Sequence, residues 1–115
     1  MPPTTIYKKW EIVLVPFPFT DLSSAKRRPA LIVSPDNYNV EKDVVIAYLT
    51  SQMNLSPRVG DYDLQKWKEA GLPKPSKVRM KFATIDKGII VKKIGKLEII
   101  DSEEIEKIIL SFFTS

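Results

Sequence analysis

The chain has 115 residues, of which 43% are hydrophobic, and a formal net charge of +4, which suits one domain, residues 1–115, with a core of its own. It contains no cysteine and no histidine, so disulfides, thiolate metal sites, serine–histidine triads and histidine-pair ribonuclease chemistry are excluded. The first residues lack a signal-peptide core and no run reaches membrane-spanning length, so we expect a cytoplasmic protein without membrane association.

The first third of the chain carries the most informative pattern. Two apolar segments, 12–17 and 29–33, are bounded by prolines and rich in β-branched residues, which predicts two strands of a small sheet. The connecting loop ends in three consecutive cations: Lys26, Arg27 and Arg28. Concentrated positive charge beside aromatic residues favours binding of a polyanion, most commonly nucleic acid. A run of charged residues is usually a solvated face. From the three cations alone, a functional and a purely structural role of Arg28 are therefore about equally expected.

The middle of the chain predicts further strands. Residues 43–49 form an unbroken apolar run that ends at Thr50-Ser51-Gln52, which is typical of a strand buried on both faces. Residues 76–84 alternate, which predicts a strand with two different faces. One face would carry Val78, Met80 and Phe82, and the other Lys77, Arg79 and Lys81. The cationic face is either a row of phosphate contacts or an ordinary exposed face. Shorter strands are expected at 60–64 and 89–94.

Two helices are predicted in the second half. Residues 65–70 would form a short helix that is closed by Gly71, a residue suited to the left-handed conformation at helix ends. A longer C-terminal helix would begin at Asp101, with Glu104 completing a capping box. Apolar residues follow at helical spacing: Ile105, Ile108, Ile109 and Phe112. This face needs cover, either from the sheet or from a second copy of the chain.

Five or six short strands with one terminal helix predict a mainly β (α+β) fold, in the form of a compact, strongly bent sheet or barrel. The gaps between the first three predicted strands are too short for crossover helices. A parallel sheet of βαβ units is therefore not expected.

Four segments together resemble the MazF/PemK/Kid family of type II toxin–antitoxin toxins. They are IVLVPFPFTD at 12–21, KRRPALIVS at 26–34, LTSQ at 49–52 and ATIDKGII at 83–90. The first two are specific, and the others are weak alone but occur in the expected order. The resemblance implies a small SH3-like barrel of the CcdB/MazF type with a C-terminal helix, a homodimer, and a cognate antitoxin as partner. It also implies metal-independent, cofactor-independent cleavage of single-stranded RNA at short sequences.

Two catalytic positions of the family carry over onto this sequence. The arginine before proline falls on Arg28, and the threonine after the third strand falls on Thr50. The chain departs from common family patterns at Trp10-Glu11 in place of Gly-Asp, at Ser23-Ser24-Ala25 in place of a loop acid, and at Arg79-Met80-Lys81 in place of Arg-x-Asp. These departures weigh against an acid-based mechanism and place the weight on Arg28 and Thr50.

RNA cleavage without a metal uses the ribose 2′-hydroxyl as nucleophile and builds charge on the non-bridging phosphate oxygens. A planar guanidinium fits those oxygens through two parallel hydrogen bonds, which is the role expected of Arg28. Thr50 can donate to the same phosphate or hold the 2′-hydroxyl. The expected products carry 2′,3′-cyclic phosphate and 5′-hydroxyl ends. The general base stays open, and Glu11 and Asp21 are the carboxylates near the motif.

Further residues are predicted to contact RNA: Phe17, Lys26, Arg27, Ser51, Gln52, Arg79 and Lys81. Phe17 is either a core residue or a platform on which a base stacks. The alternative function is a non-catalytic RNA- or antitoxin-binding protein, or a gyrase inhibitor of the CcdB kind on the same fold. A mere binder has no need of the Arg28–Thr50 pair, so the pair favours the enzyme.

Overall fold

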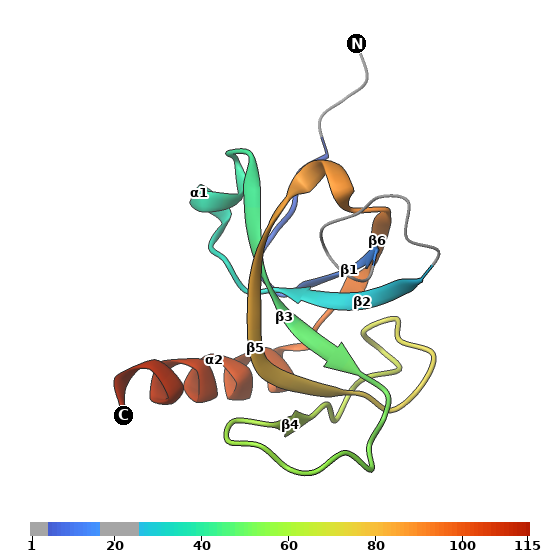
Figure 1. The fold of residues 1–115 in the computed structure, drawn as a ribbon, viewed down its shortest axis with the longest axis vertical. Helices are drawn as coiled ribbons and strands as arrows, with labels where there is room; N and C mark the ends of the chain where they lie inside the picture. The colour runs from blue at the N-terminus through green and yellow to red at the C-terminus, as the bar shows by residue number, and fades with distance from the viewer. Residues whose placement is uncertain (1–4, 17–25) are drawn as a thin grey trace.

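The computed structural model describes residues 5–16 and 26–115 (Figure 1). The elements follow in the order β1 (Glu11–Pro16), β2 (Arg27–Ile32), α1 (Asp36–Asn39), β3 (Asp43–Thr50), β4 (Tyr62–Asp63), β5 (Lys77–Asp86), the 3₁₀ helix η1 (Lys87–Ile89), β6 (Lys92–Lys96) and α2 (Ile99–Thr114). No helix in the described part of the chain has the length and apolar character needed to cross a membrane.

The strands form one six-stranded sheet in the order β4-β5-β3-β2-β1-β6, and every neighbouring pair is antiparallel. The sheet is strongly curled, and α2 packs beside it with the C-terminus projecting outward (Figure 1). The prediction of a mainly β (α+β) fold with a bent antiparallel sheet and a C-terminal helix is confirmed.

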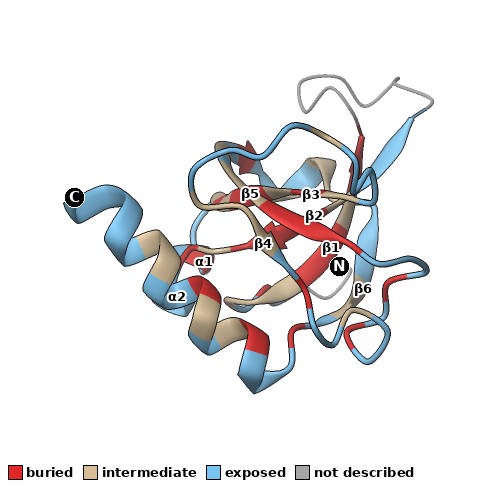
Figure 2. Ribbon diagram, turned by 90° about the horizontal axis from the view of Figure 1, so that it is seen from below, coloured by how far each residue is buried: buried red, intermediate tan, exposed pale blue. Residues whose placement is uncertain are grey.

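The sheet buries apolar side chains on both faces. One cluster contains Ile12, Leu31 and Ala47, and α2 covers it through Ile105. The second cluster lies on the other face and contains the strand neighbours of these residues: Val13, Val15, Ala30, Ile32, Val44, Ile46 and Ile85. The division follows from the period of two, which sends successive side chains to opposite faces. Buried residues run along the strands and the first turns of α2, whereas the end of α2 is exposed (Figure 2).

Several predicted boundaries were wrong. The strand predicted from residue 29 begins at Arg27, so Arg27 and Arg28 belong to β2 and not to the loop. The strand predicted at 89–94 is β6, which begins only at Lys92 after η1. The strand predicted at 43–49 is buried on both faces, as expected, except that Val45 on one face and Tyr48 on the other are only partly buried. Phe17, Asp21 and Ser23-Ser24-Ala25 lie outside the described residues.

The helix predicted at 65–70 is a single turn. The Ala70 amide donates to the Lys66 carbonyl, and the next two amides donate to Lys68 and Trp67. Gly71 has a φ of +94°, so its predicted left-handed conformation is confirmed. The segment is too short to extend into a helix, because an isolated turn gains few hydrogen bonds for the residues it orders.

Asp101 does not cap its own helix. α2 begins at Ile99 with Glu98 as the N-cap, so the predicted capping box was wrong. The Asp101 side chain is fully buried and accepts hydrogen bonds from the Tyr62 hydroxyl at 2.7 Å and from the amides of Gln65 at 2.9 Å and Lys66 at 2.8 Å. Its carboxylate therefore fixes the turn that precedes β5 against α2.

Candidate functional site

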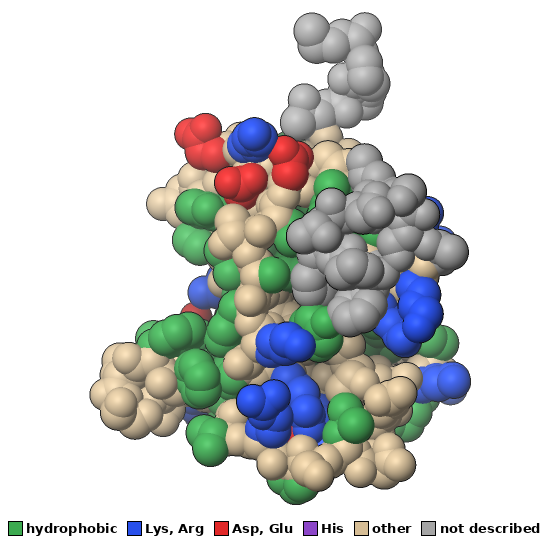
Figure 3. Space-filling view, in the orientation of Figure 1, with side chains coloured by type: hydrophobic (Ala, Val, Ile, Leu, Met, Phe, Trp, Pro, Cys, Tyr) green, Lys and Arg blue, Asp and Glu red, His purple; other side chains and the backbone are tan. Residues whose placement is uncertain are grey.

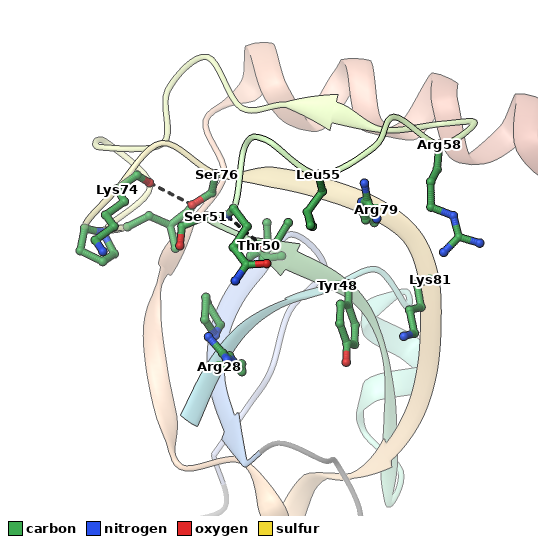
Figure 4. Close-up of a pocket in the computed structure, with 15 residues that line it drawn as sticks. Arg28, Tyr48, Thr50, Ser51, Leu55, Arg58, Lys74, Ser76, Arg79 and Lys81 are labelled. Atoms are coloured by element: carbon green, nitrogen blue, oxygen red, sulfur yellow. Dashed lines mark hydrogen bonds between the residues drawn. The ribbon is translucent and has the colours of Figure 1, made fainter. Parts of the chain in front are cut away.

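A cavity of about 470 Å³ opens where β2, β3 and β5 approach the segments after β3 and before β5 (Figure 4). Six of the predicted site residues line it: Arg28, Thr50, Ser51, Gln52, Arg79 and Lys81. Sequence reasoning did not identify its other polar lining residues, which are Tyr48, Arg58, Lys74 and Ser76. Five of all the lining side chains are cationic: Arg28, Arg58, Lys74, Arg79 and Lys81. The cavity therefore suits a polyanion.

The cavity continues the sheet face that carries the second apolar cluster. Arg28 lies two residues before Ala30 on β2, and Lys81 lies two residues before Ala83 on β5. On β3, Tyr48 follows Ile46 at the same spacing. Because alternate residues share a face, one face is apolar at one end and polar at the other.

The register of β2 and β3 brings the two predicted catalytic residues together. Ala30 lies opposite Tyr48, and Leu31 lies opposite Ala47. The pairing ends at Ala30 and Tyr48, and Arg28 and Thr50 each lie two residues beyond it, where both line the cavity. Arg28 is exposed, so a ligand in the cavity can reach its guanidinium.

The Thr50 hydroxyl is oriented by a local hydrogen bond. Its Oγ1 accepts a hydrogen bond from the Gln52 amide at 3.1 Å, an arrangement common where Thr begins a turn. The hydroxyl uses a lone pair for this bond and keeps its proton to donate. Thr50 can therefore donate to a phosphate that Arg28 holds.

Tyr48 stands beside both residues. Burial raises the pKa of Tyr48, and the Arg28 guanidinium partly opposes that rise. The Lys81 Nζ lies 4.6 Å from the centre of the Tyr48 ring. A bulge in β5 gives this position to Lys81, because Ala47 pairs with Phe82 while Tyr48 pairs with Arg79. Bulges commonly redirect side chains in this way. The two-residue spacing from Thr50 was the signal that could have identified Tyr48.

The opposite wall of the cavity is built around an ion pair. Arg79 Nη2 lies 3.3 Å from Asp61 Oδ2 and donates to the Ser56 carbonyl at 2.6 Å. Lys77 lies 4.0 Å from the same carboxylate oxygen. The exposed fractions of the three side chains are 14% for Arg79, 10% for Asp61 and 9% for Lys77. Lys77 is therefore buried. Of the three cations predicted to share one face of this strand, only Lys81 is exposed.

The other predicted site residues lie elsewhere. Lys26 and Arg27 are exposed and do not line the cavity, and Phe17 lies outside the described residues. Glu11, a candidate general base, lies 3.2 Å from Lys93 and accepts the Lys8 amide at 2.6 Å, so it has a structural role.

On the face shown in Figure 3, most of the basic side chains lie apart from the acidic ones. Lys and Arg side chains gather around the ends of β2 and β3 and the middle of β5, whereas acidic side chains lie near the start of β3 (Figure 3). In the described part of the chain, no group of three acidic, histidine or cysteine side chains could hold a metal ion. The geometry offers a guanidinium, two hydroxyls and further cations to one phosphodiester-sized ligand.

Comparison with solved structures shows the same fold. The endoribonuclease of a Mycobacterial species, solved with its cognate antitoxin, aligns with a TM-score of 0.72 at 16% identity, over 91% of this chain and 92% of the other. MazF in the MazE–MazF complex of Deinococcus radiodurans aligns with a TM-score of 0.73 at 17% identity, over 96% and 98%. The Mycobacterium tuberculosis toxin MazF-mt6 gives 0.70 at 20% identity, over 90% and 95%.

No curated protein sequence matches the chain significantly. The family model of the PemK-like, MazF-like toxins of type II toxin–antitoxin systems matches residues 8–113. That span covers nearly all of the described residues, including every element of the sheet and the cavity. The chain therefore belongs to the PemK-like, MazF-like toxin family of type II toxin–antitoxin systems.

Proposed function

We propose that the protein is a metal-independent, sequence-specific endoribonuclease that cleaves single-stranded RNA in the cytoplasm and acts as the toxin of a toxin–antitoxin pair. The observation that carries this proposal is the cavity that Arg28 and Thr50 line together from adjacent strands. Endoribonucleases among the structures of the same fold support it.

Each residue has a distinct role in this proposal. Arg28 holds the two non-bridging oxygens of the scissile phosphate and stabilises the charge that grows on them. Thr50 donates its proton to the phosphate or holds the 2′-hydroxyl in line with the bond that breaks. The products would carry 2′,3′-cyclic phosphate and 5′-hydroxyl ends. Ser51, Gln52 and Lys81, which line the same cavity, would contact the flanking nucleotides.

The proposed partners are a second copy of the chain and a cognate antitoxin. Leu110 and Phe113 of α2 are 61% and 65% exposed, and the Phe113 ring packs on Phe82 and Phe112 at centroid distances of 5.4 and 5.1 Å. An apolar cluster of this size at the surface is typical of an interface. Structures of the same fold that contain an antitoxin support the second partner.

The test is cleavage of a single-stranded RNA library by the purified protein in EDTA. We expect discrete cuts whose ends are recognised by a ligase specific for 2′,3′-cyclic phosphate. Arg28→Ala should lower the cleavage rate at least about 1,000-fold with an unchanged circular dichroism spectrum. Lys42→Ala is the matched control, because Lys42 lies 80% exposed beside Asp86 near the start of β3. Intact RNA, or cleavage that requires an added metal, would overturn the proposal.

A further inference from the structure

We propose that Tyr48 is a further catalytic residue, which donates its phenolic proton to the 5′-oxygen that leaves when the RNA strand is cut. This inference rests on the proposed function of the cavity and names the proton donor of that reaction.

The first argument is the position of the hydroxyl. Tyr48 lies two residues before Thr50 on β3, so both side chains point from the same face of the sheet into the cavity. Figure 4 shows the Tyr48 hydroxyl end between the side chains of Arg28 and Lys81. A phosphate held by Arg28 and Thr50 would therefore lie beside the phenol.

The second argument concerns the face of the ring. The ammonium of Lys81 lies 4.6 Å from the ring centre, which is a cation–π contact. This contact occupies one face of the ring and fixes its orientation. A ring held in this way keeps its hydroxyl at a fixed position in the cavity, where a bound phosphodiester can meet it.

The third argument is protonation. A leaving-group donor must hold its proton at neutral pH and release it only in the transition state. Burial raises the pKa of Tyr48, so the phenol stays protonated. The nearby Arg28 guanidinium acts in the opposite sense and would stabilise the phenolate once the proton has moved.

The fourth argument compares Tyr48 with the other side chains that could donate a proton in the cavity. The chain has no histidine. The Asp61 carboxylate contacts the lining residue Arg79, but it is committed to Arg79 and Lys77. Arginine holds its proton more firmly than the task requires, and the Lys81 ammonium is turned over the Tyr48 ring. The phenol is the neutral acid that the cavity offers.

The proposed step is balanced as a transesterification. The 2′-oxygen forms a bond to phosphorus and its proton passes to solvent, while the bond between phosphorus and the 5′-oxygen breaks. The 5′-oxygen takes the proton of Tyr48, and the phenolate regains a proton from water. No water is consumed, and the products carry a 2′,3′-cyclic phosphate and a 5′-hydroxyl.

The test compares Tyr48→Phe with the unaltered protein under single-turnover conditions. The variant keeps the ring and the Lys81 contact, so we expect an unchanged melting temperature. On an ordinary oligonucleotide that contains the cleavage site, its rate should fall about 100-fold. Its affinity for the same oligonucleotide with a 2′-deoxy block should stay within about twofold. Tyr38→Phe, at an exposed tyrosine of α1, should change neither quantity.

A second substrate separates proton donation from positioning. An oligonucleotide with sulfur in place of the 5′-bridging oxygen releases a thiolate, which needs no proton because thiols are much stronger acids than alcohols. We expect Tyr48→Phe to cleave this substrate at nearly the unaltered rate. An equal loss on both substrates, or no loss on the ordinary one, would overturn the inference. If the unaltered protein cuts neither substrate, the proposed function itself fails.

Discussion

Arg28 and Arg79 line the same cavity from opposite walls, yet their surroundings differ. Arg28 lies at the start of β2, where it is exposed and lines the cavity together with Thr50. Arg79 lies on β5 with its side chain only 14% exposed, 3.3 Å from Asp61 and hydrogen-bonded to the Ser56 carbonyl. One arginine is presented to the cavity, and the other holds the cavity wall together.

The difference shows how the fold divides two identical side chains between chemistry and structure. Arg28 is exposed at the cavity, whereas a phosphate would have to compete with the Asp61 carboxylate for the mostly buried Arg79. The Asp61 contact is itself imperfect, since Asp61 Oδ1 and Arg79 Nε are buried without a hydrogen-bond partner in the described part of the chain. Such a pair fixes geometry more than it adds stability.

Exchange of each arginine for lysine is expected to give the largest effect and separates the two roles. Arg28→Lys should lower the cleavage rate on the order of 100- to 1,000-fold, because a point charge cannot donate two parallel hydrogen bonds to the phosphate. Arg79→Lys should change the rate by less than about fivefold, since lysine keeps the charge beside Asp61. Single-turnover cleavage rates measure both. Equal losses at the two positions would contradict the division.

When stability is measured in place of the cleavage rate, removal of the charge should have the larger effect at Arg79 and the smaller effect at Arg28. Arg79→Met leaves Asp61 with one buried cation in place of two, and should lower the free energy of unfolding by about 3 kcal/mol. Arg28→Met should change it by less than about 0.5 kcal/mol, because the side chain is exposed. Urea denaturation measures both values.

A double-mutant cycle tests the cause of that loss. Asp61→Asn in the Arg79→Met background should restore part of the stability, because the buried carboxylate that has lost Arg79 is then removed, while Lys77 keeps its contact with Asp63. Strictly additive losses would mean that Arg79 contributes through packing alone.

The sequence predicts one of these two walls and not the other. Arg28 before Pro29 and Thr50 at a strand end were predicted because the family resemblance places its catalytic residues there, and the apolar pattern predicted the two strands next to them. The contact between Asp61 and Arg79 joins a loop to a strand, and no periodic pattern in the sequence predicts such a contact. The alternation of residues 76–84 gave the correct strand, but could not show that Lys77 meets a carboxylate from that loop.

Asp101 illustrates the same limit in a helix. Local rules correctly predicted a C-terminal helix and gave Asp101 the role of its cap. The fold instead uses its carboxylate for the amides of Gln65 and Lys66, which are far from it in sequence. Tyr48 is different: it was not predicted, but its two-residue spacing from Thr50 is a local signal that could have identified it.

Thr50 tests whether the Arg28 wall works as a pair, with a smaller expected effect. Thr50→Val removes the hydroxyl at constant shape, and should lower the cleavage rate roughly 10- to 100-fold, the worth of a hydrogen bond to a charged group. Thr50→Ser keeps the donor and should stay within about threefold. If Val and Ser behave alike in the single-turnover assay, the hydroxyl does not contact the reacting groups.

The smallest effect is expected from the cations outside the cavity, Lys26 and Arg27, which are exposed on the chain that leads into Arg28. Each would neutralise one RNA phosphate without touching the reacting one. Its replacement by alanine should therefore weaken RNA binding equally for all sequences and reduce the slope of log affinity against log salt by about 0.7. Lys42→Ala, near the start of β3, should leave that slope unchanged. A fall in the cleavage rate of bound RNA with Lys26→Ala or Arg27→Ala would extend the catalytic wall beyond Arg28, because a distant charge that acts by attraction alone changes affinity and not the chemical step.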